Sequence, residues 1–337
     1  MLVHPFAQAA VFIVPLGMPK LLQCWGNGGL HVCTAVAAWL PKLQLLKIYC
    51  ISVSLLTFCY PRFSHSLFFN ITSFNSETDN IAFEGDAVPV NGTIELSSVN
   101  YPWRVGHLMY DQPVRLWDST QGLLTDFRTR FSFTIDYKKS SRYSDGIAFY
   151  MAHIGRSIPP NSAGGYLGLF NTSNNENVSE NSIVLVEFDT FSNADFDPPD
   201  VDRHVGINQN SLSSRAYTNF DIEGNEGKQG HVLITYNATT KYLLVYWSFN
   251  KSLTELLPSS ANLSLKINLM EILPEWIKIG FSASTGPNPQ RQVIHSWEFS
   301  STLNSTDSNT SRSGERKRQY NSCQSQPITT TLRSVGR

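Results

Sequence analysis

Charge and cysteine are both scarce in the body of this chain. Charged residues make up 16% of its 337 residues and the net charge is −1, whereas about 25% of the residues in an average soluble protein are charged. Nothing in the charge therefore favours binding to nucleic acid or to an anionic membrane. All five cysteines lie before Pro61 or after Ser322, which excludes an internal disulfide or a thiolate metal site between those residues.

Amphipathic helical patterns are missing too. Residues 67–300 consist of short apolar or alternating runs separated by polar turn residues. RFSFTIDY at 130–137 alternates, as a strand with one buried face does, whereas DGIAFYMAHI and NSIVLVEFDTF are continuously apolar, as in strands buried on both faces. HVLITY and KYLLVYW flank the polar turn NATT and predict a hairpin. Without any βα alternation, these runs predict an all-β fold, an antiparallel β-sandwich or jelly roll.

The two ends of the chain differ from this body. Residues 42–66 have basic residues, then the apolar run IYCISVSLLTFCY, then small polar residues, which predicts a signal peptide, with a signal anchor as the alternative. Residues 1–41 are interpreted as a spurious or atypical N-terminal extension. Residues 302–337 are rich in Ser and Thr and then basic, which predicts a disordered tail. Residues 67–301 remain as one folded domain.

Glycosylation sequons support secretion independently of the N-terminus. Asn-x-Ser/Thr triplets recur throughout the body and into the tail, and this density is typical of an extracellular glycoprotein. The nine sequons begin at Asn70, Asn91, Asn171, Asn177, Asn237, Asn250, Asn262, Asn304 and Asn309.

The stretch VEFDTFSNADFDPPDVDRH, Val186 to His204, concentrates carboxylates in a chain otherwise poor in charge. Strand alternation places two of them on one face, where they would repel each other unless a cation lay between them. Oxygen ligands suit Ca²⁺, whereas a histidine suits a transition metal such as Mn²⁺ or Zn²⁺. Two neighbouring ions are therefore predicted, with a solvated acidic loop as the alternative. One ion would be bound by Glu187, Asp189, Asp197 and His204, and the other by Asp189, Asn193, Asp197 and a main-chain carbonyl such as that of Phe191.

VEFDTFSN, followed by DP and HVGIN, resembles the metal loop of the legume (L-type) lectins, with spacings similar to those of pea and lentil lectins. The resemblance covers Leu67 to Ser301 and includes the ordered segments SDGIAFYMA, GGYLGLFN, GFSASTG and SWEFSS. It implies a jelly-roll sandwich of the concanavalin A type, with Ca²⁺ and Mn²⁺ beside a shallow sugar pocket.

The resemblance also implies which residues contact the sugar. Asp145 would accept hydrogen bonds from two sugar hydroxyls, and its peptide bond with Ser144 would be cis. Gly165 would donate its N–H, Asn193 would donate its amide while its oxygen binds Ca²⁺, and the ring of Phe191 would stack on the sugar.

Two positions depart from the family pattern. Pro287 lies in a loop whose N–H groups contact the sugar in pea-like lectins, and since proline has no N–H, Asn288 would have to contribute more. Asn208 stands where many relatives have an aspartate, which is expected to loosen the surroundings of the ion site.

These features favour a secreted Ca²⁺/Mn²⁺-dependent lectin of the mannose/glucose type, at the cell surface or in the apoplast. The alternative is the ectodomain of a plant lectin receptor-like kinase, whose longer forms continue into a membrane span and a kinase, sensing a ligand other than a simple sugar. Catalysis is not expected, because carboxylates that bridge ions cannot also transfer protons and no catalytic motif is present. The family commonly forms homodimers through sheet edges, which glycans could block here.

Overall fold

The computed structural model describes residues 66–98, 100–136, 144–175, 180–250 and 261–305. The expected N-terminal extension (1–41) and nearly all of the expected signal peptide (42–66) lie outside these residues, as does the tail beyond residue 305. Within the described ranges, no helix combines the length and the apolar character that crossing a lipid bilayer requires.

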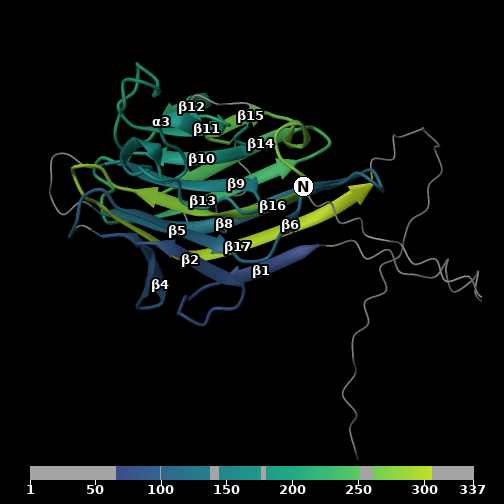
Figure 1. The fold of residues 1–337 in the computed structure, drawn as a ribbon, viewed down its shortest axis with the longest axis horizontal. Coiled ribbons are helices and arrows are strands. Elements are labelled where there is room, and N and C mark those ends of the chain that lie inside the picture. The colour runs from purple at the N-terminus through teal and green to yellow at the C-terminus, as the bar shows by residue number, and fades with distance from the viewer. Residues whose placement is uncertain (1–65, 99, 137–143, 176–179, 251–260, 306–337) are drawn as a thin grey trace, which may run out of the picture. The chain divides into compact units, whose positions relative to one another are not determined.

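Two antiparallel sheets make up the domain (Figure 1). The nine-stranded sheet has the order β15 (Leu263–Lys266), β14 (Tyr242–Ser248), β13 (Gln229–Asn237), β8 (Leu123–Asp136), β17 (Arg291–Ser305), β4 (Thr93–Ser97) and β3 (Val88–Val90), with β1 (Leu67–Ile71) on β17 and β7 (Trp117–Asp118) on β8. The eight-stranded sheet has the order β12 (Ser214–Asn219), β11 (His204–Gln209), β10 (Ile183–Asp189), β9 (Gly146–His153), β16 (Trp276–Ser284), β5 (Val105–Tyr110) and β2 (Ile81–Gly85), with β6 (Val114–Arg115) on β16. The described helices are single turns: η1 (Gly164–Tyr166), α3 (Thr172–Asn175) and η2 (Leu269–Glu271).

An aromatic core joins the two sheets. Phe131 of β8 and Trp297 of β17 both contact Phe281 of β16 in the other sheet, with ring centroids 4.8 and 4.9 Å apart. Alternation along β8 turns Phe131, Phe133 and Ile135 inward, as the RFSFTIDY pattern predicts. The predicted β-sandwich is therefore confirmed.

The eight-stranded sheet is covered on its other face as well. Leu185 of β10 and Tyr150 of β9 belong to a second apolar cluster, which they form with Leu167, Leu169 and Phe170 from the segment that follows β9. Every residue of β10 is consequently buried. This explains the continuous apolar runs in the sequence and confirms that these strands are buried on both faces.

The hairpin and the C-terminal end of the domain can both be compared with what the sequence predicts. The predicted hairpin is present, because β13 pairs with β14 from Asn237 opposite Tyr242 onward. β17 continues to Ser305, four residues past the expected domain end at Ser301, because its last residues pair with the start of β8 at Leu123.

The aromatic core predicts a large stability effect for Trp297→Ala. Trp297 is fully buried and its indole N–H donates a 3.0 Å hydrogen bond to Thr129. Its truncation should lower the free energy of unfolding by about 3–5 kcal/mol, measured by urea denaturation. The matched control is Phe68→Ala, which is 68% exposed and should change stability by no more than about 0.5 kcal/mol. Equal effects of the two substitutions would contradict this description of the core.

Candidate metal centre and binding pocket

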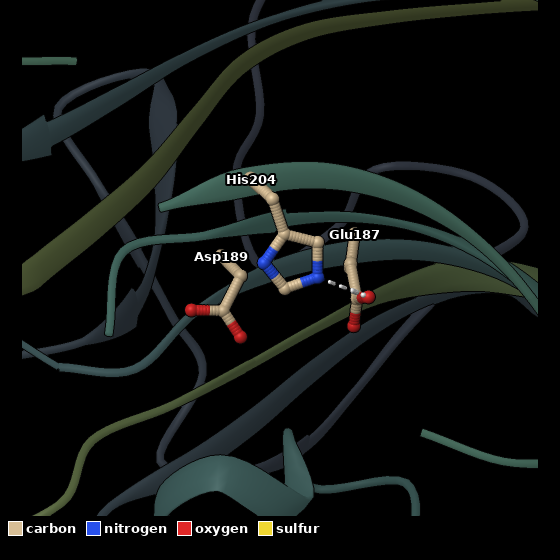
Figure 2. Close-up of side chains that lie close together, drawn as sticks. All are labelled: Glu187, Asp189 and His204. Carbon is tan, nitrogen blue, oxygen red and sulfur yellow. Dashed lines mark hydrogen bonds and ion pairs between the residues drawn. The ribbon is translucent and has the colours of Figure 1, made fainter. Parts of the chain in front are cut away.

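The predicted ligands converge where β10 ends and β11 begins. Antiparallel pairing sets Asp189 opposite His204 and Glu187 opposite Gly206. One ligand atom from each of Glu187, Asp189 and His204 lies within 4.8 Å of the others, and all three residues are buried (Figure 2). His204 Nε2 is 3.0 Å from Glu187 Oε1. The structure thus groups residues that the sequence spreads over eighteen positions, with their side chains pointing toward one another.

The loop after β10 folds back on the same centre. The N–H of Phe191 donates to Asp189 Oδ1 at 2.7 Å, and the N–H of Asn193 donates to Asp197 Oδ2 at 2.6 Å. Other buried atoms of this centre have no hydrogen-bond partner among the described residues: Asp197 Oδ1, Asn193 Oδ1 and His204 Nδ1. A buried polar atom without a partner costs about 1–3 kcal/mol, and a bound cation would remove that cost for the oxygens.

Electrostatics favour a cation here as well. Burial raises the pKa of Asp197 to about 7, with a further rise from the charge of Glu187 and an opposing effect of the Asn193 N–H. Burial, together with the charges of Asp197 and Glu187, raises the pKa of Asp189 well above its usual range. Burial acts to lower the pKa of His204, but its hydrogen bond to Glu187 and the charge of that carboxylate outweigh burial and raise it. The carboxylates can remain charged together only if positive charge is supplied.

The donor set therefore fits bound metal. Carboxylate and amide oxygens at Asp189, Asn193 and Asp197 suit a hard cation, and the imidazole of His204 beside Glu187 suits a transition metal. Metals held here would neutralise the carboxylates and fix the loop that carries Phe191.

Asp145 lies beside this centre, at the start of β9. Its N–H donates to Ser284 O at 3.1 Å, and its carbonyl accepts from the N–H and the hydroxyl of Thr190 at 2.8 and 2.9 Å. The peptide bond between Ser144 and Asp145 is cis, which confirms that expectation. Asp145 Oδ2 is buried without a hydrogen-bond partner in the described part of the chain. Burial raises the pKa of Asp145 to about 7; the Ser144 hydroxyl opposes this and the charge of Asp197 adds to it.

Gly165 and Asn193 meet across the pocket. A Cβ placed on Gly165 would lie 2.4 Å from Asn193 Oδ1, so only glycine allows this approach. A Cβ on Gly164 would lie 3.8 Å from Asp145 Oδ2. The side chains of Asp145 and Asn193 therefore each lie close to one member of the glycine pair.

The other expected pocket residues are nearby. Phe191 is half-buried, and its backbone is fixed by Asp189. Asn288 is half-buried, and its main-chain carbonyl accepts a 3.2 Å hydrogen bond from the Ser144 hydroxyl. Pro287 is exposed, and the Gly286 N–H before it donates to the same hydroxyl at 3.3 Å. Hence this loop supports the Ser144–Asp145 turn through its backbone.

Sequence reasoning missed two residues that orient the site. Ser214 of β12 donates to Glu187 Oε1 at 2.7 Å, and its hydroxyl also lies 3.0 Å from Asn208 Oδ1. Asn208 itself, which the sequence analysis had already noted, is fully buried, and its amide donates to Leu212 O at 2.6 Å. The second missed residue is Thr190, which holds Asp145 as described above. Thr190 lies inside the EFDTF segment and could have been noticed, whereas nothing local in the sequence distinguishes Ser214 from other serines.

Comparison with known proteins identifies the family. A family model described as the legume lectin domain matches residues 66–315. The chain belongs to the legume lectin family. Legume lectins are a carbohydrate-binding, non-enzymatic family, and their jelly-roll fold is the one described here.

Legume lectin relatives include both receptors and seed lectins. L-type lectin-domain containing receptor kinase IX.1 of Arabidopsis thaliana is 42% identical over 244 residues, which make up 72% of this chain and 37% of that protein. A lectin of Lens culinaris subsp. orientalis is 34% identical over 271 residues, 79% of this chain and 96% of that lectin. The solved Lotus tetragonolobus seed lectin is 34% identical with a TM-score of 0.62, covering 71% of this chain and 99% of that one. The chain therefore spans little more than a third of the receptor kinase and nearly the whole of the seed lectins.

The raised pKa values predict that stabilisation by metal grows with pH. In metal-free protein, Asp145 and Asp197 have pKa values of about 7, against about 4 in an unfolded chain. Their protonation therefore stabilises the metal-free fold below about pH 4, and this contribution is lost as pH rises through 7. Cations compete with those protons, so the gap in Tm between protein with Ca²⁺ and Mn²⁺ and protein with EDTA should widen from pH 5 to pH 8.

Thermal scans across that range would measure the gap. Asp189→Asn should shrink it, whereas Asp195→Asn, which changes an exposed carboxylate in the same loop, should leave it unchanged. A gap that stays constant with pH would contradict the assignment of Asp189 and Asp197 to the metal centre.

The Ser214 contact predicts a second effect. Ser214→Ala removes the hydrogen bond to Glu187 and should weaken Mn²⁺ affinity by about tenfold, the lower end of the cost for losing an orienting partner. Equilibrium dialysis would measure the affinity. The exposed neighbour Ser213 provides the control Ser213→Ala, and if both variants bound Mn²⁺ like the wild type, the hydroxyl would have no orienting role.

Proposed function

We propose that this chain is an extracellular carbohydrate-binding module whose sugar pocket depends on Ca²⁺ and Mn²⁺. The observation that carries the proposal is the buried acceptor Asp145 Oδ2, which has no partner in the described residues and lies beside a glycine pair that Asn193 contacts. Sugar hydroxyls are donors that such an acceptor can bind, and Gly165 can approach a ligand through its backbone.

Each residue would have a distinct role. The Asp145 carboxylate accepts from two adjacent hydroxyls, Gly165 N–H and the Asn193 amide donate, and the Phe191 ring stacks on the C–H face of the sugar. Glu187, Asp189, Asp197 and His204 would hold the ions, and Asn193 Oδ1 and the Phe191 carbonyl would add to the Ca²⁺ ligands. Bound ions would have a structural role, because they would hold the loop in the conformation that the sugar needs.

A mannose/glucose preference is proposed from the similarity to lentil and pea lectins. Solved relatives also include a lectin described in complex with GalNAc and another complexed with galactose. The preference must therefore be tested against these sugars.

The segments on either side of the domain form part of the proposal. Residues 42–66 would act as a signal peptide, the lectin domain would run from residue 67 to the end of β17 at Ser305, and the residues after it would form a polar tail, with the sequons carrying glycans outside the cell. Homodimerisation through sheet edges is possible only where those glycans leave an edge free.

A receptor-type ectodomain is the second candidate. The 42% identity to a receptor kinase favours it, as does Pro287, which removes an N–H from the pocket rim. In that case the pocket would sense a ligand other than a simple sugar, in a longer protein with a membrane span and a kinase.

Sugar chromatography tests the proposal. The full-length chain with Ca²⁺ and Mn²⁺ should be retained on immobilised mannose more strongly than on galactose or N-acetylgalactosamine. EDTA should abolish retention, and Asp145→Ala should reduce it by at least about a hundredfold because it removes a charged acceptor. Asp195→Ala is the control and should be retained like the wild type. A folded, Ca²⁺-binding protein that is retained on none of these sugars would exclude the lectin and favour the receptor-type module.

A further inference from the structure

Phe68 is an aromatic side chain that the fold leaves uncovered. It lies in β1, where burial alternates, so that Phe69 and Ile71 pack against the core while Phe68 and Asn70 turn outward. At 68%, Phe68 is more exposed than any other large apolar residue in the described part of the chain. An exposed ring on a strand is a surface to which another group can bind.

The surroundings of β1 leave space for such a group. Among the described strands, β1 pairs with β17 alone, so one of its edges has no strand beside it. β1 and the turn after it also border a hollow of about 450 Å³, whose lining includes Phe68, Asn70, Thr72, Asp79 and Asn80. An unpaired strand edge beside an exposed ring favours association between chains unless something covers it.

The group that can cover the ring is specified by the sequence of β1 itself. Asn70-Ile71-Thr72 is a glycosylation sequon, and both Asn70 and Thr72 are exposed. Residues two positions apart on a strand share a face and lie about 6.5–7 Å apart along it, which brings Phe68 within reach of a sugar on the Asn70 amide. Of the nine sequons, this is the one with an aromatic residue two positions before its asparagine.

The neighbouring strand leaves the ring open on this face. Ser300 of β17 lies opposite Phe68, and its side chain is too short to cover the ring. Glu298 lies opposite Asn70, and its carboxylate is held by Arg130 Nη1 at 3.3 Å. A sugar attached to Asn70 would therefore have a flat apolar ring on one side and an oriented hydrogen-bond acceptor on another.

We propose that Asn70 carries an N-linked glycan whose first N-acetylglucosamine stacks on the ring of Phe68. The inference rests on the extracellular location in the proposed function and deepens it, because it assigns one modification site and its structural role. The C–H face of the sugar covers the ring, as apolar faces cover exposed aromatic rings elsewhere. The rest of the glycan shields the unpaired edge of β1 from other chains.

The modification transfers an oligosaccharide from a lipid diphosphate to Asn70. Asn70 Nδ2 attacks the anomeric carbon of the first N-acetylglucosamine, and the new C–N bond forms as the bond from that carbon to the diphosphate oxygen breaks. The lipid diphosphate leaves with the electron pair, and Nδ2 gives up one of its two protons to a base of the transferase. No oxidation or reduction takes place. The hydroxyl of Thr72 completes the triplet that the transferase recognises.

Glycopeptide mass spectrometry of the full-length chain, secreted from plant cells, tests occupancy. Nearly every copy should carry a glycan at Asn70. Glycans at other sequons together with an unmodified Asn70 would overturn the inference alone. A chain without a glycan at any sequon would instead overturn the extracellular location in the proposed function, and the inference with it.

Thermal unfolding of the same protein tests the stacking contact. An endoglycosidase first trims each glycan to one N-acetylglucosamine, so that only the first sugar is compared. Phe68→Ala, which removes the ring, should lower Tm by about 2–4 °C, the effect of one stacking contact in a domain of this size. Thr72→Ala, which removes the sequon, should have the same effect. The double variant should have a Tm no lower than either single variant, because both remove the same contact.

Two controls separate this contact from other effects. In chain made in bacteria, which carries no glycan, Phe68→Ala should leave Tm unchanged; this is the form in which it serves as the control for the core. Asn91→Asp removes the exposed sequon at the turn between β3 and β4, where Asp tolerates the φ of 50° as Asn does, and should leave the Tm of glycosylated chain unchanged. Equal effects of Phe68→Ala with and without glycan, or additive effects of Phe68→Ala and Thr72→Ala, would overturn the stacking.

Discussion

The structure around the pocket depends on one electrostatic constraint, which is that burial and neighbouring carboxylates raise the pKa values of Asp189 and Asp197. A cation would let these two carboxylates remain charged together. The loop after β10 is shaped by the same constraint. Main-chain N–H groups bind one oxygen of Asp189 and one of Asp197, and another oxygen of Asp197 is left for an ion. This fold of the loop places Asn193 against Gly165. Neutralising the carboxylates and forming the pocket are therefore coupled.

The sandwich supplies what that coupling requires. Because β9 lies between β10 and β16, Gly146 pairs with Asp189 on one side and Ser284 on the other. Asp145, one residue earlier, is consequently held from both sides, by the backbone of Ser284 and by Thr190. Asp145 therefore lies where three strands come together, and the backbone from which its carboxylate projects is held by Ser284 of β16 and by Thr190, directly after β10.

Much of this arrangement could be predicted from the sequence, for reasons that particular residues show. Glu187, Asp189 and His204 lie within eighteen residues of one another, and strand alternation alone puts the first two on one face. Ser214 could not be found, because only the register of β12 against β11 brings it to Glu187. Local pattern identifies ligands on one strand, whereas long-range pairing decides what surrounds them.

The metal side and the rim of the site are under different constraints. The carboxylates beneath the pocket allow few substitutions, because each removed ligand leaves another buried charge uncompensated. The rim consists of loop residues held mainly by backbone bonds, as when the Trp103 N–H binds Gly286 O, so side chains there can change while the backbone stays. Asp145 and the metal centre would therefore decide whether a sugar binds at all, and the rim around Asn288 would decide which one. On this basis Pro287, an exposed rim residue, would alter ligand choice without weakening the metal centre.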